Sequence, residues 1–167
     1  MATTTITATE CPQCGKTGKA VQPLTLRALL KGACGSQVAE GEYRFCDREG
    51  CAVVYFGHGQ TFTTAQLKVP VGVKETTGER PLCYCFHHSV ATIKEELRTK
   101  GRSDALEDIG RRMKDAGCRC AVTNPSGSCC LGTVRRGIEA VQAELNRTPA
   151  AGSKAESNPP WRDHCCP

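Results

Sequence analysis

Paired cysteines constrain this chain of 167 residues more than any other feature of its sequence. Cys34 stands alone, and the other 12 of the 13 cysteines fall in short pairs: Cys11/Cys14, Cys46/Cys51, Cys83/Cys85, Cys118/Cys120, Cys129/Cys130 and Cys165/Cys166. A hydrophobic core gives no reason for cysteines to come two at a time beside glycine and proline. Metal ions do give such a reason, because one ion takes several thiolates from short turns.

The same cysteines in a secreted chain would indicate a disulfide framework. The first residues, MATTTITATECPQC, show no basic start, no apolar stretch and no small-residue cleavage site. We therefore expect a cytoplasmic protein, in which clustered thiols hold metal or carry out redox chemistry. No run approaches the roughly 18 apolar residues of a membrane-spanning helix, so we expect no membrane insertion.

The formal net charge of +5 treats every cysteine as neutral. A zinc ion with four thiolates, or an oxidised [2Fe–2S] cluster with four thiolates, carries a net charge of about −2. One of each would lower the charge of the chain to about +1. Because no stretch interleaves basic and aromatic residues, we expect no nucleic-acid partner.

The pattern of apolar residues predicts an α+β protein with a β-rich first half. Short β-branched and aromatic runs indicate three strands, at 42–46, 52–56 and 61–69. The segment 23–35 fits a helix or a strand equally well. The polar, turn-rich stretch 75–81 marks the end of this β-rich module, which we place at residues 1–81.

Helical periodicity begins after that boundary. Ser89 and Ser103 are suited to cap two helices, and a third helix is expected from about 130 to 147. These helices form a unit over 82–147 with its cysteines in the connecting loops. The last segment, 148–167, has the composition of a disordered tail and ends in His164, Cys165 and Cys166.

Four cysteines of the first half have the spacing of a zinc site. Cys11 and Cys14 are separated by two residues and followed by a glycine, and Cys46 and Cys51 form a second short turn. Four thiolates close the coordination sphere, so such a site is structural rather than catalytic. Rubredoxin-type iron in the same ligand set is the alternative, because ligand type separates iron from zinc poorly.

The helical half offers six cysteines for a second centre. Cys83 and Cys85, one residue apart, suit the edge of an iron–sulfur cluster. Cys118 and Cys120 repeat that spacing, while Cys129 and Cys130 precede a helix whose N-terminus favours a thiolate. A [2Fe–2S] cluster needs only four of the six, and the residues themselves leave the choice open.

Several of these segments resemble the N-terminal domain of the CopZ copper chaperone family: the two cysteine turns, 51–56, 71–74, 82–85 and 120–130. The resemblance covers about residues 11–135 and implies a zinc module joined to a helical unit like bacterioferritin-associated ferredoxin. It implies one zinc ion on Cys11, Cys14, Cys46 and Cys51. It also implies one [2Fe–2S] cluster on Cys83, Cys85, Cys120 and Cys130, with Cys129 and Cys118 as alternates.

The resemblance further implies single-electron transfer in the homeostasis of copper or another thiophilic metal, including reduction of Cu(II) to Cu(I). The partners would be that metal ion and an electron-transfer or metal-transport protein. The family also carries a heavy-metal-associated domain, which we do not expect in this chain. Its place is taken by the tail, where His164, Cys165 and Cys166 are candidate ligands for Cu(I) or Hg(II).

A rival interpretation is a metal-sequestering module that binds Cu(I) or Hg(II) through its surplus thiols without electron transfer. Cys34 is expected to be a lone thiol, and His87 and His88 to lie near the second centre or at the surface. The sequence contains no catalytic triad, carboxylate pair or nucleotide fingerprint. We therefore expect an electron-transfer or metal-binding protein rather than an enzyme.

Overall fold

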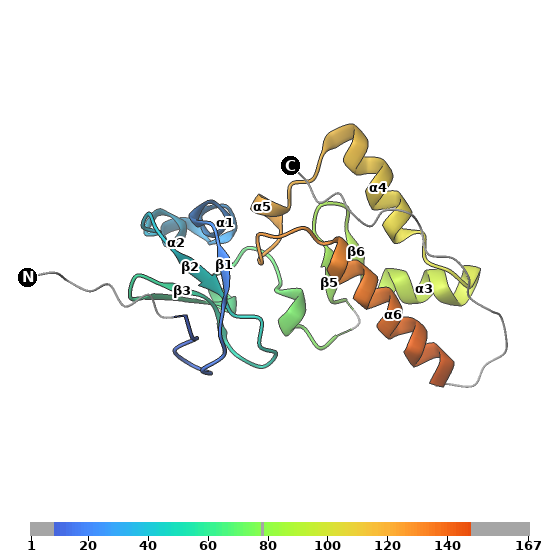
Figure 1. Ribbon diagram of the computed structural model, residues 1–167, viewed down its shortest axis with the longest axis horizontal. Helices are drawn as coiled ribbons and strands as arrows, with labels where there is room; N and C mark the ends of the chain where they lie inside the picture. Colours follow the sequence, from blue (N-terminus) through green and yellow to red (C-terminus); the bar gives the residue numbers. More distant parts are fainter. Residues whose placement is uncertain (1–8, 78, 148–167) are drawn as a thin grey trace, which may run out of the picture. The chain divides into compact units, whose positions relative to one another are not determined.

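The computed structural model describes residues 9–77 and 79–147, so the candidate tail ligands His164, Cys165 and Cys166 lie outside the described residues. The described chain forms two compact units (Figure 1). The first comprises residues 9–76 together with Ala121–Ser128, and the second comprises the rest. The predicted α+β class is confirmed. The expected boundary at residue 81 falls a few residues after this division, and no local pattern predicts that Ala121–Ser128 belongs to the first unit.

The first unit is built on a four-stranded antiparallel sheet in the order β1-β2-β3-β4. Its strands are β1 (Lys19–Val21), β2 (Tyr43–Phe45), β3 (Val53–Gly57) and β4 (Gln60–Thr63). β3 and β4 are joined by His58 and Gly59, whose φ angles of 51° and 71° suit a tight hairpin turn. The expected strand at 61–69 is shorter in the structure, because the 3-10 turn η1 (Thr64–Gln66) follows β4 directly.

The segment whose periodicity fitted a helix or a strand forms two short helices, α1 (Pro23–Leu29) and α2 (Gly32–Ser36). Proline at the first helical position suits the start of α1, since its missing N–H would have no partner there. Leu26 and Leu30 pack with Tyr43, Phe45 and other sheet residues in one core. A second 3-10 turn, η2 (Gly72–Lys74), follows.

The second unit contains the hairpin β5 (Pro81–Cys83) and β6 (His88–Ser89), followed by α3 (Val90–Lys100), α4 (Ala105–Ala116) and α6 (Leu131–Arg147). A short helix, α5 (Cys120–Thr123), precedes α6, and its residues from Ala121 onward belong to the first unit. The apolar faces of α3, α4 and α6 form one core, which includes Ile93, Ile109 and Val134. Among the described residues, no helix has the length and apolar character needed to cross a membrane.

Two predicted helix starts have different outcomes. The Ser89 side chain accepts a hydrogen bond from the Thr92 N–H at 3.2 Å, so the predicted cap of α3 is confirmed. The predicted Ser103 cap of α4 is wrong by one residue, because Asp104 occupies the N-cap position. Ser103 instead donates from Oγ to Glu96 Oε2 at 2.7 Å and thereby ties the α3–α4 turn together.

Candidate metal centres

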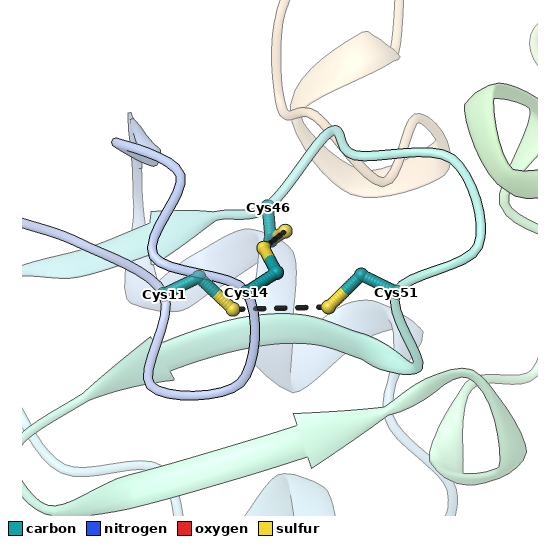
Figure 2. Close-up of side chains that lie close together, drawn as sticks. All are labelled: Cys11, Cys14, Cys46 and Cys51. Carbon is teal, nitrogen blue, oxygen red and sulfur yellow. Dashed lines mark hydrogen bonds between the residues drawn. The ribbon is translucent and has the colours of Figure 1, made fainter.

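Two turns bring Cys11, Cys14, Cys46 and Cys51 together beside the sheet of the first unit (Figure 2). The first turn is closed by the Gly15 N–H, which donates to the Cys11 carbonyl oxygen at 2.8 Å. Gly15 has a φ of 70°, a conformation that suits glycine. The second turn joins the end of β2 to the start of β3, and the Cys46 N–H donates to the Val54 carbonyl oxygen at 2.8 Å.

The four sulfur atoms have the spacing of a tetrahedral thiolate site. The Cys11 and Cys51 sulfurs lie 3.8 Å apart, the Cys14 and Cys46 sulfurs lie 3.6 Å apart, and all four lie within 4.8 Å of one another. Zinc–sulfur bonds of about 2.3 Å in a tetrahedron place neighbouring sulfurs about 3.8 Å apart. Cys14 is half-buried and the other three are buried. The donor set therefore fits zinc.

The surroundings of the four thiols act unequally on their ionisation. The Lys16 backbone N–H, as the largest influence, lowers the pKa of Cys14 to about 7, whereas burial raises the pKa of Cys46 to about 12. Burial also raises the pKa of Cys51. A cation at the centre would stabilise all four sulfurs as thiolates, because its charge offsets the loss of hydration.

Basic side chains support the two turns of this site. Lys16 and Lys19 form ion pairs with Asp47 at 2.7 Å and 3.0 Å. Lys74 donates from Nζ to the carbonyl oxygens of Arg48 at 3.0 Å and Cys51 at 2.9 Å. These cations lie where four thiolates would place negative charge, so part of the basic excess of the chain has a local role.

The structure gathers a second set of sulfurs in the helical unit. The Cys130 and Cys83 sulfurs lie 3.2 Å apart, and the Cys85 and Cys120 sulfurs lie 3.7 Å apart. Cys120 and Cys130 also interact with each other, so the four sulfurs form one continuous group. They come from the β5–β6 hairpin, from the start of α5 and from the residue before α6. Cys85 is half-buried, and the other three are at most 4% exposed.

Contacts between these sulfurs shift their pKa values in opposite directions. The hydrogen bond from Cys130 is the largest influence that lowers the pKa of Cys120, to about 6, and it also lowers the pKa of Cys83. The hydrogen bonds to Cys120 and Cys83, together with burial, raise the pKa of Cys130. In addition, the Arg119 backbone N–H donates to the Cys85 sulfur at 3.4 Å. The four sulfurs thus lie close enough to influence one another, and the Arg119 N–H adds a donor to one of them.

Three further cysteines lie within the described chain. Cys129 is half-buried, and its neighbour Cys130 provides the buried sulfur beside Cys83. Cys118 is half-buried and packs against the helical core. Cys34 is half-buried and accepts a hydrogen bond from Gln66 Nε2 at 3.5 Å.

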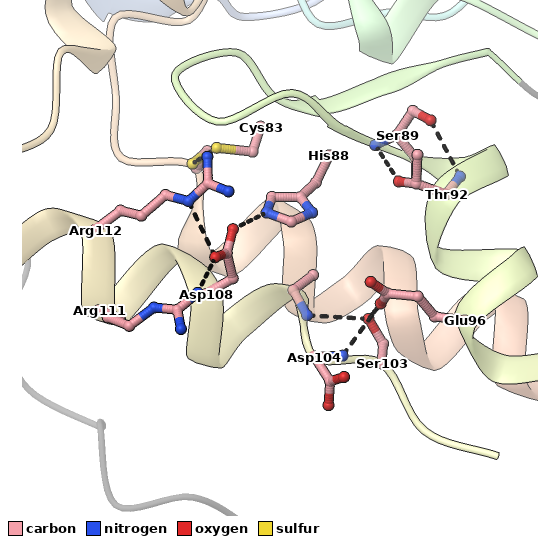
Figure 3. Close-up of polar contacts among 12 residues, drawn as sticks. Cys83, His88, Ser89, Thr92, Glu96, Ser103, Asp104, Asp108, Arg111 and Arg112 are labelled. Atoms are coloured by element: carbon pink, nitrogen blue, oxygen red, sulfur yellow. Dashed lines mark hydrogen bonds and ion pairs between the residues drawn. The ribbon is translucent and has the colours of Figure 1, made fainter. Parts of the chain in front are cut away.

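Sequence reasoning missed a polar network beside the second group of sulfurs (Figure 3). Asp108 accepts from His88 Nε2 at 3.0 Å, from Arg111 at 2.7 Å and from Arg112 at 3.0 Å. The Arg112 guanidinium also lies 5.7 Å from the ring centroid of Phe86, which directly follows Cys85. The spacing of Asp108, Arg111 and Arg112 on one helix could have predicted the two Asp108–arginine pairs, because residues three and four apart are neighbours on a helix. The link to His88 is long-range and had no sequence signal. His87 is exposed.

Comparison with known proteins agrees with the zinc-type site in the first unit. Residues 8–68 match a family model described as a zinc binding domain of the CopZ type. The copper chaperone CopZ of Archaeoglobus fulgidus is 39% identical over 120 residues, which cover 72% of this chain and 57% of that protein. This chain therefore matches little more than half the length of that relative.

A solved structure shows that this similarity extends to the fold. The crystal structure of the Archaeoglobus fulgidus CopZ N-terminal domain matches with a TM-score of 0.65 and 38% identity. The match covers 76% of this chain and 95% of that domain. Sequence and fold thus agree over most of the described residues. The chain belongs to the family of the zinc-binding CopZ N-terminal domain.

Proposed function

We propose that this protein is a zinc-stabilised electron-transfer protein in the homeostasis of copper or another thiophilic metal. The observation that carries the proposal is the second group of sulfurs, from Cys83, Cys85, Cys120 and Cys130, which lies apart in sequence from the zinc-type site. A zinc-binding module alone has no need of these four cysteines. A cytoplasmic location is part of the proposal, because free thiols persist in a reducing compartment.

In this proposal the ligands of the zinc ion are Cys11, Cys14, Cys46 and Cys51. Four thiolates leave no coordination position for water, so the ion stabilises the fold and takes no part in a reaction. Lys74 contributes by holding the carbonyl oxygens of Arg48 and Cys51, which fixes the second cysteine turn. The turn is then ready to bind the ion together with the first.

The ligands of the second centre are Cys83, Cys85, Cys120 and Cys130. When bound there, a [2Fe–2S] cluster supplies one-electron oxidation and reduction. Cys83, Cys120 and Cys130 are buried and exclude water from the site. Cys85 is half-buried, so its side of the site is the one nearest to solvent and to a partner. The Arg119 N–H donates to the Cys85 sulfur, a contact that stabilises negative charge there.

The link to copper rests on the printed name of the relative, copper chaperone CopZ. Reduction of Cu(II) to Cu(I) would consume one electron, which a cluster held by Cys83, Cys85, Cys120 and Cys130 would supply from its reduced state. An electron-donor protein must then restore that electron. Thiolates prefer soft ions such as Cu(I) and Hg(II), and for this reason His164, Cys165 and Cys166 remain predicted ligands for Cu(I) or Hg(II).

Metal analysis of protein purified without oxygen tests the proposal. We expect a brown protein with about two iron atoms and one zinc ion per chain, whose colour is bleached by dithionite. Colourless protein with two zinc ions per chain would contradict electron transfer. That result would favour the rival function, a module that sequesters soft metals through its thiols.

A further inference from the structure

The 121–128 segment separates two of the proposed cluster ligands, Cys120 and Cys130, yet it belongs to the first unit. Two buried hydroxyl groups of that unit hold its backbone. Thr25 Oγ1 donates to the Ala121 carbonyl oxygen at 2.6 Å, and the Tyr55 hydroxyl donates to the Pro125 carbonyl oxygen at 2.6 Å. Both side chains are 0% exposed, so these hydrogen bonds replace hydration that burial has removed.

The 121–128 segment is also ordered by its own contacts. Asn124 is buried, donates from Nδ2 to the Ser128 carbonyl oxygen at 2.8 Å and accepts from the Ser126 N–H at 3.1 Å. Gly127 has a φ of 66°, and a Cβ atom there would lie 2.9 Å from Thr25 Oγ1. A side chain at this position would therefore push the segment away from Thr25. The backbone of the segment is fixed at Ala121, Pro125 and Gly127.

We propose that Thr25 and Tyr55 are positioning residues for the second metal centre, because the segment that they hold leads directly into its ligands. Cys120 immediately precedes the segment, and Cys130 follows it by two residues. Cysteines that are held in place lose less conformational entropy on binding a metal than cysteines on a mobile chain. The identity of the second centre as an iron–sulfur cluster rests on the proposed function. The positioning of Cys120 and Cys130 by Thr25 and Tyr55 does not depend on that identity.

The hydrogen bond from Tyr55 to the Pro125 carbonyl oxygen also links the zinc-type site to the positioning of Cys120 and Cys130. Tyr55 lies in β3, which begins two residues after the proposed zinc ligand Cys51. Zinc binding orders the turn that leads into this strand, and the strand presents the hydroxyl that holds Pro125. Zinc thus supports the second centre through the fold, without taking part in its chemistry.

The substitution Tyr55→Phe tests the role of the hydroxyl and keeps the ring. Tyr43→Phe is the matched control, because Tyr43 is equally buried in the same sheet but its hydroxyl contacts Ala39 and Gln60. In the zinc-loaded, iron-free chain, Tyr55→Phe should raise the alkylation rates of Cys120 and Cys130 about fivefold, the factor for one ordinary hydrogen bond. Tyr43→Phe should leave both rates unchanged. Mass spectrometry of the alkylated peptides measures them.

The iron-loaded protein provides a second readout. Iron release to a chelator, followed by the visible absorbance, should be about fivefold faster in Tyr55→Phe and unchanged in Tyr43→Phe. Equal alkylation rates in the wild type and both variants would overturn the inference. Faster alkylation in Tyr55→Phe alone, in a chain that never binds iron, would refute the cluster and leave the positioning role in place.

A glycine pair repeats the test if Tyr55→Phe disturbs the sheet. Gly127→Ala and Gly59→Ala introduce similar backbone strain, because the φ angles are 66° and 71°. A Cβ atom at Gly127 would meet Thr25, whereas one at Gly59 would have no neighbour within 4 Å. We expect faster alkylation of Cys120 and Cys130 in Gly127→Ala only. Equal alkylation rates in both alanine variants would show that the contacts of the 121–128 segment with Thr25 do not position these ligands.

Discussion

Cys129 and Cys130 are adjacent in the chain, yet the fold gives their sulfurs different surroundings. The Cys130 sulfur is buried and lies 3.2 Å from that of Cys83, while Cys129 is half-buried. We expect Cys130→Ser to abolish the cluster spectrum and Cys129→Ser to retain it, because a hydroxyl is a poor replacement for a thiolate ligand. Visible absorbance and iron content measure both variants.

Zinc content is the internal control for that pair, since neither substitution touches the first site. It should stay at about one ion per chain in both variants. A cluster lost in Cys129→Ser and kept in Cys130→Ser would reverse the ligand assignment. Loss in both would indicate that the turn before α6, rather than one sulfur, determines cluster binding.

Cys46 is the most buried of the four cysteines at the zinc-type site, at 0% exposed. Cys46→Ser should reduce zinc from about one ion per chain to almost none and should destabilise the first unit, because metal binding contributes to folding. Cys34→Ser is the control, since Cys34 lies in α2 and contacts Gln66. Atomic absorption and thermal unfolding measure the two effects. Full zinc content in Cys46→Ser would exclude Cys46 as a ligand.

At the scale of the secondary-structure elements, the cap of α3 gives a stability prediction. The Ser89 and Thr92 side chains each accept a hydrogen bond from the other's backbone N–H, at 3.2 Å and 2.9 Å. Ser89→Ala should lower the free energy of unfolding by about 1 kcal/mol, whereas Ser89→Asp, which can still cap the helix, should lower it much less. Denaturant unfolding followed by circular dichroism measures the change. Equal stability of Ser89→Ala and the wild type would contradict the role of this cap.

Local patterns explain why some elements were predictable. The helices α3 and α6 have apolar residues at helical spacing, and Ser89 marks a start, so sequence alone places them well. The β5–β6 hairpin was missed because its strands are only three and two residues long and include a ligand-like cysteine motif. Such strands are too short for alternation to be visible.

Long-range contacts explain what the sequence could not predict. The cysteine spacings predicted the zinc-type site and a second cysteine centre, but nothing local distinguishes Cys129 from Cys130 at the start of a helix. The Thr25–Ala121 hydrogen bond joins residues 96 apart in the chain, and His88 meets Asp108 across 20 residues. Contacts of this kind depend on the tertiary fold, so residue pattern gives no signal for them.

At the scale of the whole molecule, the formal positive charge of the chain would largely be offset by thiolate charge at two metal centres. Two centres of about −2 each would leave only a small excess from the formal charge of +5. Some of the basic side chains lie where they can act on a centre. Arg112 is about half-exposed, pairs with Asp108 and lies over Phe86, beside the half-buried Cys85. Its charge should therefore attract anionic reductants to the second centre.

The substitution Arg112→Gln tests this effect of charge on electron transfer. At low ionic strength it should slow cluster reduction by dithionite, an anion, by about threefold, because unit charges about 6 Å apart in water interact by about 0.7 kcal/mol. Reduction by the methyl viologen radical cation should instead become faster. Added salt should reduce both effects, since it screens exposed charges. Stopped-flow absorbance measures the rates.

Arg98→Gln is the control, because Arg98 is exposed on α3 of the same unit and the net charge changes equally. If net charge alone governs the rates, both variants will behave alike, and a local role of Arg112 will be excluded. If the local charge beside Cys85 governs them, only Arg112→Gln will discriminate between the anionic and the cationic reductant. That difference would identify the surface around Phe86 and Arg112 as the side at which electrons enter the protein.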